Sequence, residues 1–406
     1  MPNYRVTRSL QKEKQKQAAA RAESRENRRE ASLRRLTRGA VALAALAAVV
    51  VAGWAGLGPV RLSGLADFAQ TVGRRGGGFP LESGGGNVLR AALVGDALAL
   101  LWPTSLDIHT PTAHRSNRAD AYTDPAISAA GGRVVQFDRA SGKLALYSRT
   151  RELYVKELSR PLFCVGLGRR GDLAAACGAE GASTEITAWD TKEKQVFNWR
   201  CEKEYPSALQ PSGDGRGLGL CLVGTEQAAV YARFVEFAYN KERPVTDLRI
   251  QDAWLYGAVQ RSGCWLAVGD RAVYRIKRGD EKPEIFSYEG RALQAFGLDE
   301  SGLCAVLLED WDNRALLRVY NRRGTLELER SFAQRPLELI CRGGSVYLRF
   351  DGMLLRWQKA TGFRQSGNIP PGTQQIFPSG ASAYVITLGG VDRVRLRWRA
   401  VDKDML

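Results

Sequence analysis

The sequence is poor in histidine and in the signature segments of common enzymes. Its 406 residues include only His109 and His114, and no G-x-S-x-G, H-E-x-x-H or Walker segment occurs. Chemistry that uses histidine as a general base or as a repeated zinc ligand therefore has few residues available. An enzyme that takes Asp, Glu and Tyr from scattered loops is still allowed. No catalytic, cofactor-binding or metal-binding residue is indicated, and we predict none.

Cysteine is also sparse, and no two cysteines are adjacent. Most of the seven lie within apolar runs, where a thiol behaves as a small hydrophobic side chain, so we expect them to be buried. An odd number leaves at least one unpaired, and no cysteine precedes residue 164, which excludes an N-terminal lipid-bearing cysteine. The seven are Cys164, Cys177, Cys201, Cys221, Cys264, Cys304 and Cys341.

Charge is missing altogether from residues 39–60. These 22 residues are mostly Ala, Val, Gly and Leu, and a helix that crosses a bilayer core of ~30 Å needs about 20 apolar residues. We therefore predict one transmembrane helix at 39–60. A cleaved signal peptide is the alternative, but its basic region would be 38 residues long, whereas signal peptides have a short one.

The charges around this span predict its orientation. Residues 1–38 carry twelve Lys or Arg and four Glu, whereas only Arg61, Arg74 and Arg75 follow the span closely. Because positive charge is retained on the cytoplasmic side, residues 1–38 should form a cytoplasmic basic tail. We expect a single-pass protein of the cell membrane, anchored in the lipid bilayer through residues 39–60, with everything after residue 60 outside the cytoplasm.

The region after the span divides into a linker and a large domain. Seven glycines lie between Thr71 and Asn87, which predicts a flexible linker at 61–87. Residues 88–406 hold 44 basic and 37 acidic residues, an excess that favours anionic partners such as wall polymers. An envelope protein is the other expected partner, and nucleic acid is not expected outside the cell.

A repeated unit runs through residues 88–406. It comprises a small residue, an apolar strand, a turn rich in Gly and Asp, and a second strand with an aromatic end, as in GRVVQFDRASGKLALY and GSVYLRFDGMLLRW. Its copies begin at 95, 132, 171, 217, 263, 302, 344 and 381, about 41 residues apart. Each interval has room for two further strands, which is the length of one β-propeller blade.

The repeat predicts an all-β fold, a β-propeller of eight blades with four antiparallel strands each, with seven blades as the alternative count. A pair of β-sandwiches is a further alternative, but it does not explain the sustained period. We expect residues 87–94 to pair with the last, incomplete unit and close the ring, because closure removes exposed sheet edges. Asp351-Gly352 is expected to form a type I′ turn, and Trp357 to pack between blades.

The motifs of the repeat resemble known propellers. Strand starts such as LDESGLCAVLL and the spacing of Ala188, Asp190 and Trp199 resemble quinoprotein-like and WD-type propellers. The layout resembles an uncharacterised family of bacterial single-pass membrane proteins whose outer part is such a propeller. In quinoprotein dehydrogenases the cofactor sits over a disulfide between adjacent cysteines. No adjacent pair occurs here, so the resemblance implies no redox activity and no cofactor.

Three other motifs are explained better by structure than by chemistry. GLGRRG at 166–171 matches a dinucleotide fingerprint, but the following residues leave too little room for the helix that this site requires. His109 aligns with the aromatic strand ends, which favours a structural role over a metal site with His114. The segment 309–313 (EDWDN) has oxygen ligands suited to calcium, but it occupies a turn position where Asp and Asn are expected.

These observations predict an interaction, scaffold or sensing module at the bacterial cell envelope. The alternative is a propeller enzyme, a hydrolase or lyase acting on envelope polysaccharide. Buried, clustered carboxylates at the central mouth would favour the enzyme, whereas a basic or apolar mouth would favour binding.

Overall fold

The computed structural model describes residues 60, 63–64, 66–67, 70, 76–82, 87–113, 115–119 and 121–401. The predicted basic tail and nearly all of the predicted membrane span lie outside this part of the chain. Within it, no helix is both long enough and apolar enough to cross a membrane. Almost all regular structure in the described residues is β-strand.

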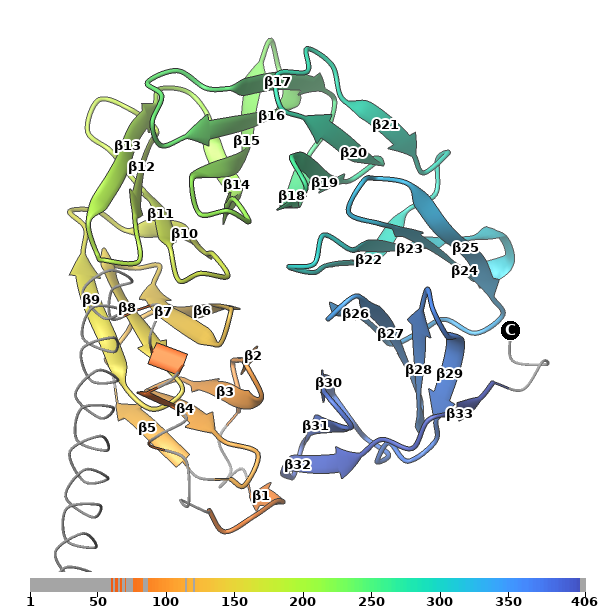
Figure 1. Ribbon diagram of the computed structural model, residues 1–406. Coiled ribbons are helices and arrows are strands. Elements are labelled where there is room, and N and C mark those ends of the chain that lie inside the picture. Colours follow the sequence, from red (N-terminus) through yellow and green to blue (C-terminus); the bar gives the residue numbers. More distant parts are fainter. Residues whose placement is uncertain are drawn as a thin grey trace, which may run out of the picture. The chain divides into compact units, whose positions relative to one another are not determined.

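Thirty-three strands form eight antiparallel sheets arranged as a ring (Figure 1). Blade 1 comprises β2 (Arg90–Val94), β3 (Ala97–Trp102), β4 (Ser105–His109) and β5 (Arg115–Ala119). Blade 2 comprises β6 (Pro125–Ala130), β7 (Arg133–Asp138), β8 (Lys143–Ser148) and β9 (Glu152–Glu157). Blade 3 comprises β10 (Leu162–Leu167), β11 (Leu173–Cys177), β12 (Thr184–Trp189) and β13 (Gln195–Cys201). Blade 4 comprises β14 (Tyr205–Pro211), β15 (Gly217–Glu226), β16 (Ala229–Ala238) and β17 (Thr246–Gln251).

The second half of the ring repeats this layout. Blade 5 comprises β18 (Leu255–Arg261), β19 (Cys264–Gly269), β20 (Ala272–Lys277) and β21 (Glu284–Ser287). Blade 6 comprises β22 (Leu293–Leu298), β23 (Cys304–Glu309), β24 (Ala315–Tyr320) and β25 (Leu326–Phe332), with a short 3-10 helix η1 (Trp311–Asn313) in its central turn. Blade 7 comprises β26 (Glu338–Arg342), β27 (Ser345–Phe350), β28 (Met353–Gln358), β29 (Gly362–Ser366) and a fifth strand β33 (Arg399–Ala400). Blade 8 comprises β30 (Gln375–Ser379), β31 (Ser382–Thr387), β32 (Gly390–Arg395) and β1 (Leu81–Glu82).

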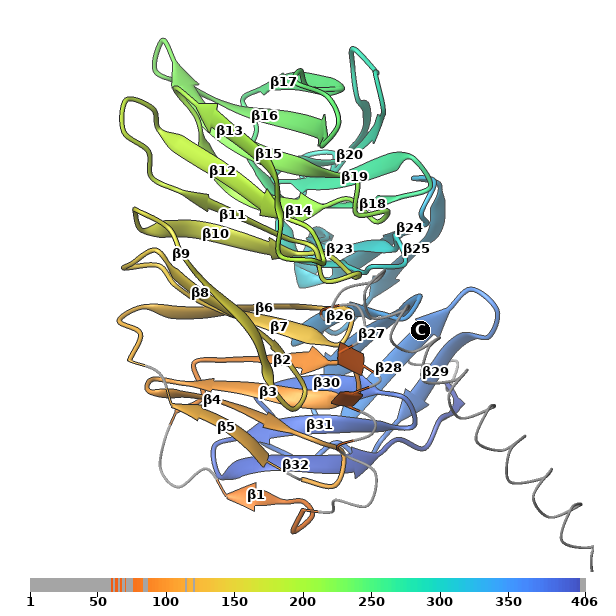
Figure 2. The same ribbon diagram turned by 60° about the vertical axis from the view of Figure 1, so that its left-hand side comes forward.

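The position of a strand within its blade accounts for its composition. The first strand of each blade lines the centre of the ring and the fourth lies at the rim (Figures 1 and 2). The second strands are packed on both faces, so strands such as β7 and β27 are buried at every position. A fourth strand such as β9 is mostly exposed or half-buried, with Tyr154 as its one buried residue, because it lies at the rim of the ring.

The hydrophobic core consists of separate clusters between neighbouring blades. One cluster joins Val135 and Leu146 of blade 2 to Leu173 of blade 3. Blades 8 and 1 are joined in the same way, since Leu98 of blade 1 packs in the same cluster as Tyr384 of blade 8. Every blade therefore contacts two neighbours through apolar side chains, and the ring is continuous. The prediction of an eight-bladed propeller of four-stranded sheets is confirmed.

The strand that closes the ring differs from the predicted one. Leu81 pairs with Val391 and Glu82 with Gly390, so β1 supplies the outer strand of blade 8. The segment 87–94, which we expected in this role, instead contains β2, the innermost strand of blade 1. Part of the predicted linker at 61–87 thus belongs to the propeller.

The predicted hairpin turn at Asp351-Gly352 is present, but its type is different. Phe350 pairs with Met353, so the loop has two residues, and Gly352 has φ +69°. A type I′ turn requires positive φ at both central residues. Asp351 is not among the described non-glycine residues with positive φ, so the type I′ prediction is wrong. Trp357 is buried in the cluster between blades 6 and 7, as predicted.

Candidate binding site at the channel mouth

A cavity opens at one end of the central channel. It has a volume of about 660 Å³, and it is lined by the ends of the first strands and the turns that follow them in blades 1, 2, 3, 6 and 7. A smaller cavity of about 160 Å³ lies beside it, bounded by blades 2 to 6. Propellers commonly bind partners at the ends of this channel, so the mouth is the candidate site.

Glycine lets these turns approach one another closely. Gly131 and Gly132 have φ values of +53° and +80°, and Gly343 and Gly344 have +57° and +71°, a region that favours glycine. A Cβ atom on Gly131 would lie 1.9 Å from the backbone oxygen of Arg169 in the next blade. Gly131 therefore permits the close approach of blades 2 and 3, whereas Gly132, Gly343 and Gly344 are favoured by their backbone conformation alone, since an added Cβ would meet nothing within 4 Å.

A bridge of polar contacts crosses the channel and separates the two cavities. The Glu300 carboxylate of blade 6 accepts a hydrogen bond of 2.9 Å from the backbone N–H of Gly131 in blade 2. The Arg169 guanidinium of blade 3 lies 3.8 Å from the same carboxylate. Because Arg169 and Glu300 line both cavities, a ligand in the larger one would meet this ion pair at its wall.

Arg342 is the second basic group of the mouth. Its guanidinium donates to the Gly95 carbonyl oxygen over 2.6 Å, which joins blade 7 to blade 1. Burial lowers the pKa of this side chain, while the nearby Asp299 and Glu300 oppose the shift. Asp299 itself accepts from the Gly344 N–H at 3.0 Å and from the Ser301 hydroxyl. The mouth therefore combines guanidinium groups with carboxylates that are already held by turns.

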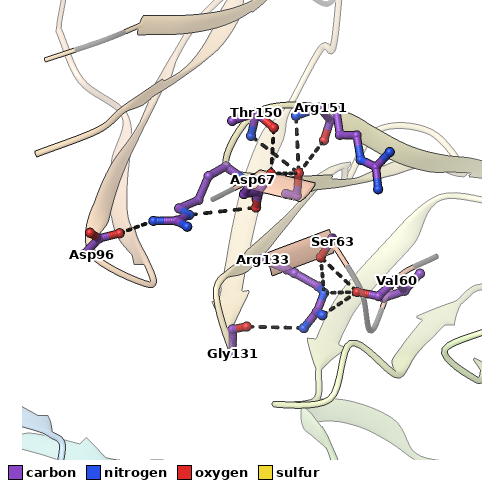
Figure 3. Close-up of polar contacts among 10 residues, drawn as sticks. Val60, Ser63, Asp67, Asp96, Gly131, Arg133, Thr150 and Arg151 are labelled. Atoms are coloured by element: carbon purple, nitrogen blue, oxygen red, sulfur yellow. Dashed lines mark hydrogen bonds and ion pairs between the residues drawn. The ribbon is translucent and has the colours of Figure 1, made fainter. Parts of the chain in front are cut away.

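The few described residues at 60–67 form a second polar network on the same side of the ring (Figure 3). Arg133, which is 6% exposed at the start of β7, donates from Nε to the Val60 carbonyl oxygen at 2.8 Å and to the Ser63 hydroxyl at 3.1 Å. The Val60 side chain is fully buried and packs in the core cluster of blades 2 and 3. Residue 60 is thus fixed to the propeller by both its backbone and its side chain.

Asp67 anchors the end of this segment. Its carboxylate accepts hydrogen bonds from the hydroxyls of Ser148 at 2.7 Å and Thr150 at 2.6 Å, and from the Arg149 N–H at 3.2 Å (Figure 3). The Arg149 guanidinium lies between Asp67, at 3.8 Å, and Asp96 of blade 1. Since Asp96 follows Gly95, the network of the segment borders the channel mouth.

The motifs singled out in the sequence fall at other places. GLGRRG covers the end of β10 and the turn to β11, so no helix opens on its glycines, as the sequence analysis expected. His109 is buried at the end of β4, and His114 lies outside the described residues. Asp310 of EDWDN contacts the Arg291 guanidinium at 3.2 Å and the Ser331 hydroxyl at 2.9 Å, a structural role within the turn.

No group of three or more metal-ligating side chains occurs among the residues that the model describes. All seven cysteines are free thiols. Five are buried, and Cys164 and Cys341 are partly buried, in agreement with the expected apolar positions. Burial raises the pKa of the Cys164 and Cys304 thiols to about 12, which makes them poor nucleophiles.

The sequence analysis did not identify the channel mouth or the contacts of residues 60–67 with the propeller. Arg169, Glu300 and Arg342 belong to ordinary turn sequences, and only their positions around the ring bring them together. The available signal was the paired glycines at 131–132 and 343–344, which mark tight turns at the same point of the repeat. For Val60 and Asp67, no pattern linked them to partners some 70 to 80 residues later in the chain.

Comparison with solved structures supports the fold alone. The computationally designed Ika8 protein matches with a TM-score of 0.54 at 9% identity, covering 78% of this chain and 98% of that one. The C-terminal WD40 domain of Sif2 gives 0.54 at 10% identity, covering 77% and 96%. The Dos1 propeller gives 0.53 at 10% identity, covering 79% and 96%.

No curated protein matches the sequence. One family model does, over residues 117–396, which is most of the propeller from the end of blade 1 to the end of blade 8. The chain therefore belongs to DUF5711, a family of unknown function.

Proposed function

We propose that this protein is a binding module at the bacterial cell envelope, held at the membrane by a helix at 39–60 with residues 1–38 in the cytoplasm. The propeller then lies outside the cytoplasm and presents the channel mouth to an envelope protein or an anionic wall polymer. One observation carries this proposal. Val60, the last residue of the predicted span, is buried against the propeller beside the channel mouth.

The chemistry of the mouth supports binding over catalysis. Glu300 is exposed and held by the Gly131 N–H and by Arg169, and Asp299 is held by the turn at Ser301 and Gly344. Carboxylates that act as a general acid and base need separate environments that shift their pKa values apart. Here the Glu300 and Asp299 carboxylates are held by contacts with neighbouring turns. The group whose pKa is shifted by burial is the basic Arg342.

The topology can be tested on the full chain in cells. Protease added to intact cells or protoplasts should degrade the propeller and leave a tag at the N-terminus intact. Lysed cells, in which both sides are accessible, are the control. Protection of the C-terminal part in intact protoplasts would refute the proposed orientation.

Binding at the mouth can be tested by cross-linking in membranes. We expect the full chain to capture an envelope protein or wall polymer, and Arg342→Ala to reduce capture several-fold because it removes the half-buried guanidinium. Arg160→Ala, an exposed residue between β9 and β10 on the other side of the ring, should leave capture unchanged. Equal capture by both variants would place the binding surface elsewhere.

A further inference from the structure

The two ends of the channel differ in the turns that surround them. We call attachment face the side that carries the turns joining the first strand of a blade to its second and the third strand to its fourth, where Val60 and Asp67 are bound. Its turns are 95–96, 110–113, 131–132, 149–151, 168–172, 190–194, 212–216, 239–245, 262–263, 278–283, 299–303, 321–325, 343–344, 359–361 and 380–381. The opposite face carries the remaining turns, 87–89, 103–104, 121–124, 139–142, 158–161, 178–183, 202–204, 227–228, 252–254, 270–271, 288–292, 310–314, 333–337, 351–352, 367–374 and 388–389.

Exposed charge is distributed unequally between these faces. On the turns of the attachment face, twelve Lys or Arg and five Asp or Glu are exposed. On those of the opposite face, the described residues include six exposed basic and seven exposed acidic groups. The attachment face is therefore strongly basic and the opposite face almost neutral, although the two have similar numbers of turns.

Internal contacts do not remove this excess. Two of the twelve basic groups, Arg278 and Lys359, pair with the strand carboxylates of Glu236 and Glu327, which still leaves ten basic groups against five acidic ones. The exposed acidic groups are partly occupied as well. Asp214 accepts from the Ser212 hydroxyl at 2.6 Å and from the Arg216 N–H at 3.0 Å.

We infer that the turns of the attachment face around the channel mouth lie against an anionic phospholipid bilayer, so that the partner proposed for the mouth is itself at the membrane surface. This inference rests on the proposed membrane anchor. If a span ends at Val60, the chain has no free residues between the bilayer and the propeller, since Val60 itself is bound to Arg133 and buried. The face that holds Val60 must then be the one near the lipid surface. Basic groups near an anionic surface are attracted to it, and the attraction decays within a Debye length of ~8 Å.

Lysine footprinting can test this contact. The full chain is incorporated into nanodiscs of phosphatidylcholine alone or with phosphatidylglycerol, and acetylation of each lysine is followed by mass spectrometry. Lys192, Lys194, Lys241 and Lys282 lie on the attachment face, whereas Lys203 and Lys143 lie on or next to turns of the opposite face. We expect acetylation of the first group to slow by at least about threefold in the anionic discs, with recovery in roughly 0.5 M salt, and the second group to be unaffected.

A matched pair of variants removes charge from one face at a time within blade 6. Arg322→Glu with Arg323→Glu acts on the attachment face, and Arg314→Glu with Arg335→Glu acts on the opposite face; all four arginines are exposed. Only the first variant should restore acetylation in the anionic discs. Equal lysine rates on both faces of an incorporated protein would refute the lipid contact and leave the anchor intact. Failure of the full chain to incorporate would refute the anchor, and the lipid contact with it.

Discussion

At the scale of single residues, Gly352 shows how backbone conformation constrains the sequence. It has φ +69°, and a Cβ atom at this position would meet nothing within 4 Å. A side chain here therefore lowers stability through the backbone conformation, and not through contact with neighbouring atoms. We expect Gly352→Val to lower the free energy of unfolding by about 1 to 3 kcal/mol, because β-branched residues avoid positive φ.

Gly367 provides the control for this prediction, since it also has open space but no positive φ. Gly367→Val should cost less than about 0.5 kcal/mol in the same denaturant titration. Equal losses for the two variants would mean that the turn conformation does not determine the cost.

Asp172 is a buried carboxylate at the start of β11. It is 2% exposed, and neither of its oxygens has a hydrogen-bond partner among the described residues. Burial raises its pKa from 3.8 to about 6. Between these values the folded state binds more protons than the unfolded state, so stability falls as pH rises through this window. Above pH 6 the ionised group costs about 3 kcal/mol.

Asp172→Asn should therefore increase the free energy of unfolding at pH 7.5, by about 1 to 3 kcal/mol, and bring little gain at pH 4. Chemical denaturation at the two pH values measures this difference. Asp124→Asn, at a half-exposed carboxylate, should change stability little at either pH. A gain of the same size at both pH values would show that ionisation is not its cause.

At the scale of the strand, β28 illustrates the two faces of a blade. Trp357 is buried among apolar residues of blades 6 and 7, whereas the Arg356 guanidinium stacks over the Trp398 ring at 4.4 Å. Trp357→Ala should destabilise the propeller by about 3 to 5 kcal/mol. Arg356→Ala should cost about 1 kcal/mol, the scale of a partly exposed cation–π contact. Thermal melts of both variants measure the difference, and equal losses would contradict the assigned faces.

The pairing of β1 with β32 depends on a second glycine. A Cβ atom on Gly390 would lie 2.1 Å from the backbone oxygen of Leu81, and its φ is +151°. Gly390→Ala should therefore displace β1 and speed amide hydrogen exchange in β32. Gly389→Ala is the matched control, because its nearest neighbour, the Thr387 hydroxyl, lies 4.0 Å away. Unchanged exchange in Gly390→Ala would mean that β1 tolerates the added group.

At the scale of the whole molecule, the described residues at 60–67 bind the start of the described chain to blade 2. Asp67→Ala removes three hydrogen bonds and leaves the buried Ser148 hydroxyl with fewer partners. We expect a loss of about 1 to 3 kcal/mol and faster amide exchange at 148–151. Asp67→Asn, which keeps one acceptor oxygen, should lose less. Unchanged exchange in both variants would mean that the segment is not held by this carboxylate.

The sequence was sufficient to predict the propeller because every blade repeats its own strand and turn pattern. Strands such as β7 and β8 are recognisable from apolar runs separated by turn residues, without reference to the rest of the ring. The closing strand was missed because Leu81–Glu82 is too short to show periodicity and lies among glycines. The mouth was missed for a different reason. The contact of Gly131 with Glu300 depends on the angular positions of blades 2 and 6, which no local pattern encodes.

The pairing of Leu81 with Val391 also has a consequence for the order in which the protein forms. The two residues are 310 positions apart, so the ribosome makes one half of this pairing long before the other. Blades 1 to 7 each contain four strands that are consecutive in sequence and can assemble as they are synthesised. Blade 8 cannot, and the completed circle is necessarily one of the last events in folding. A nascent chain that terminates before β32 would leave β1 without its partner strand. The unpaired strand would distinguish such a product from the folded protein and mark it for degradation.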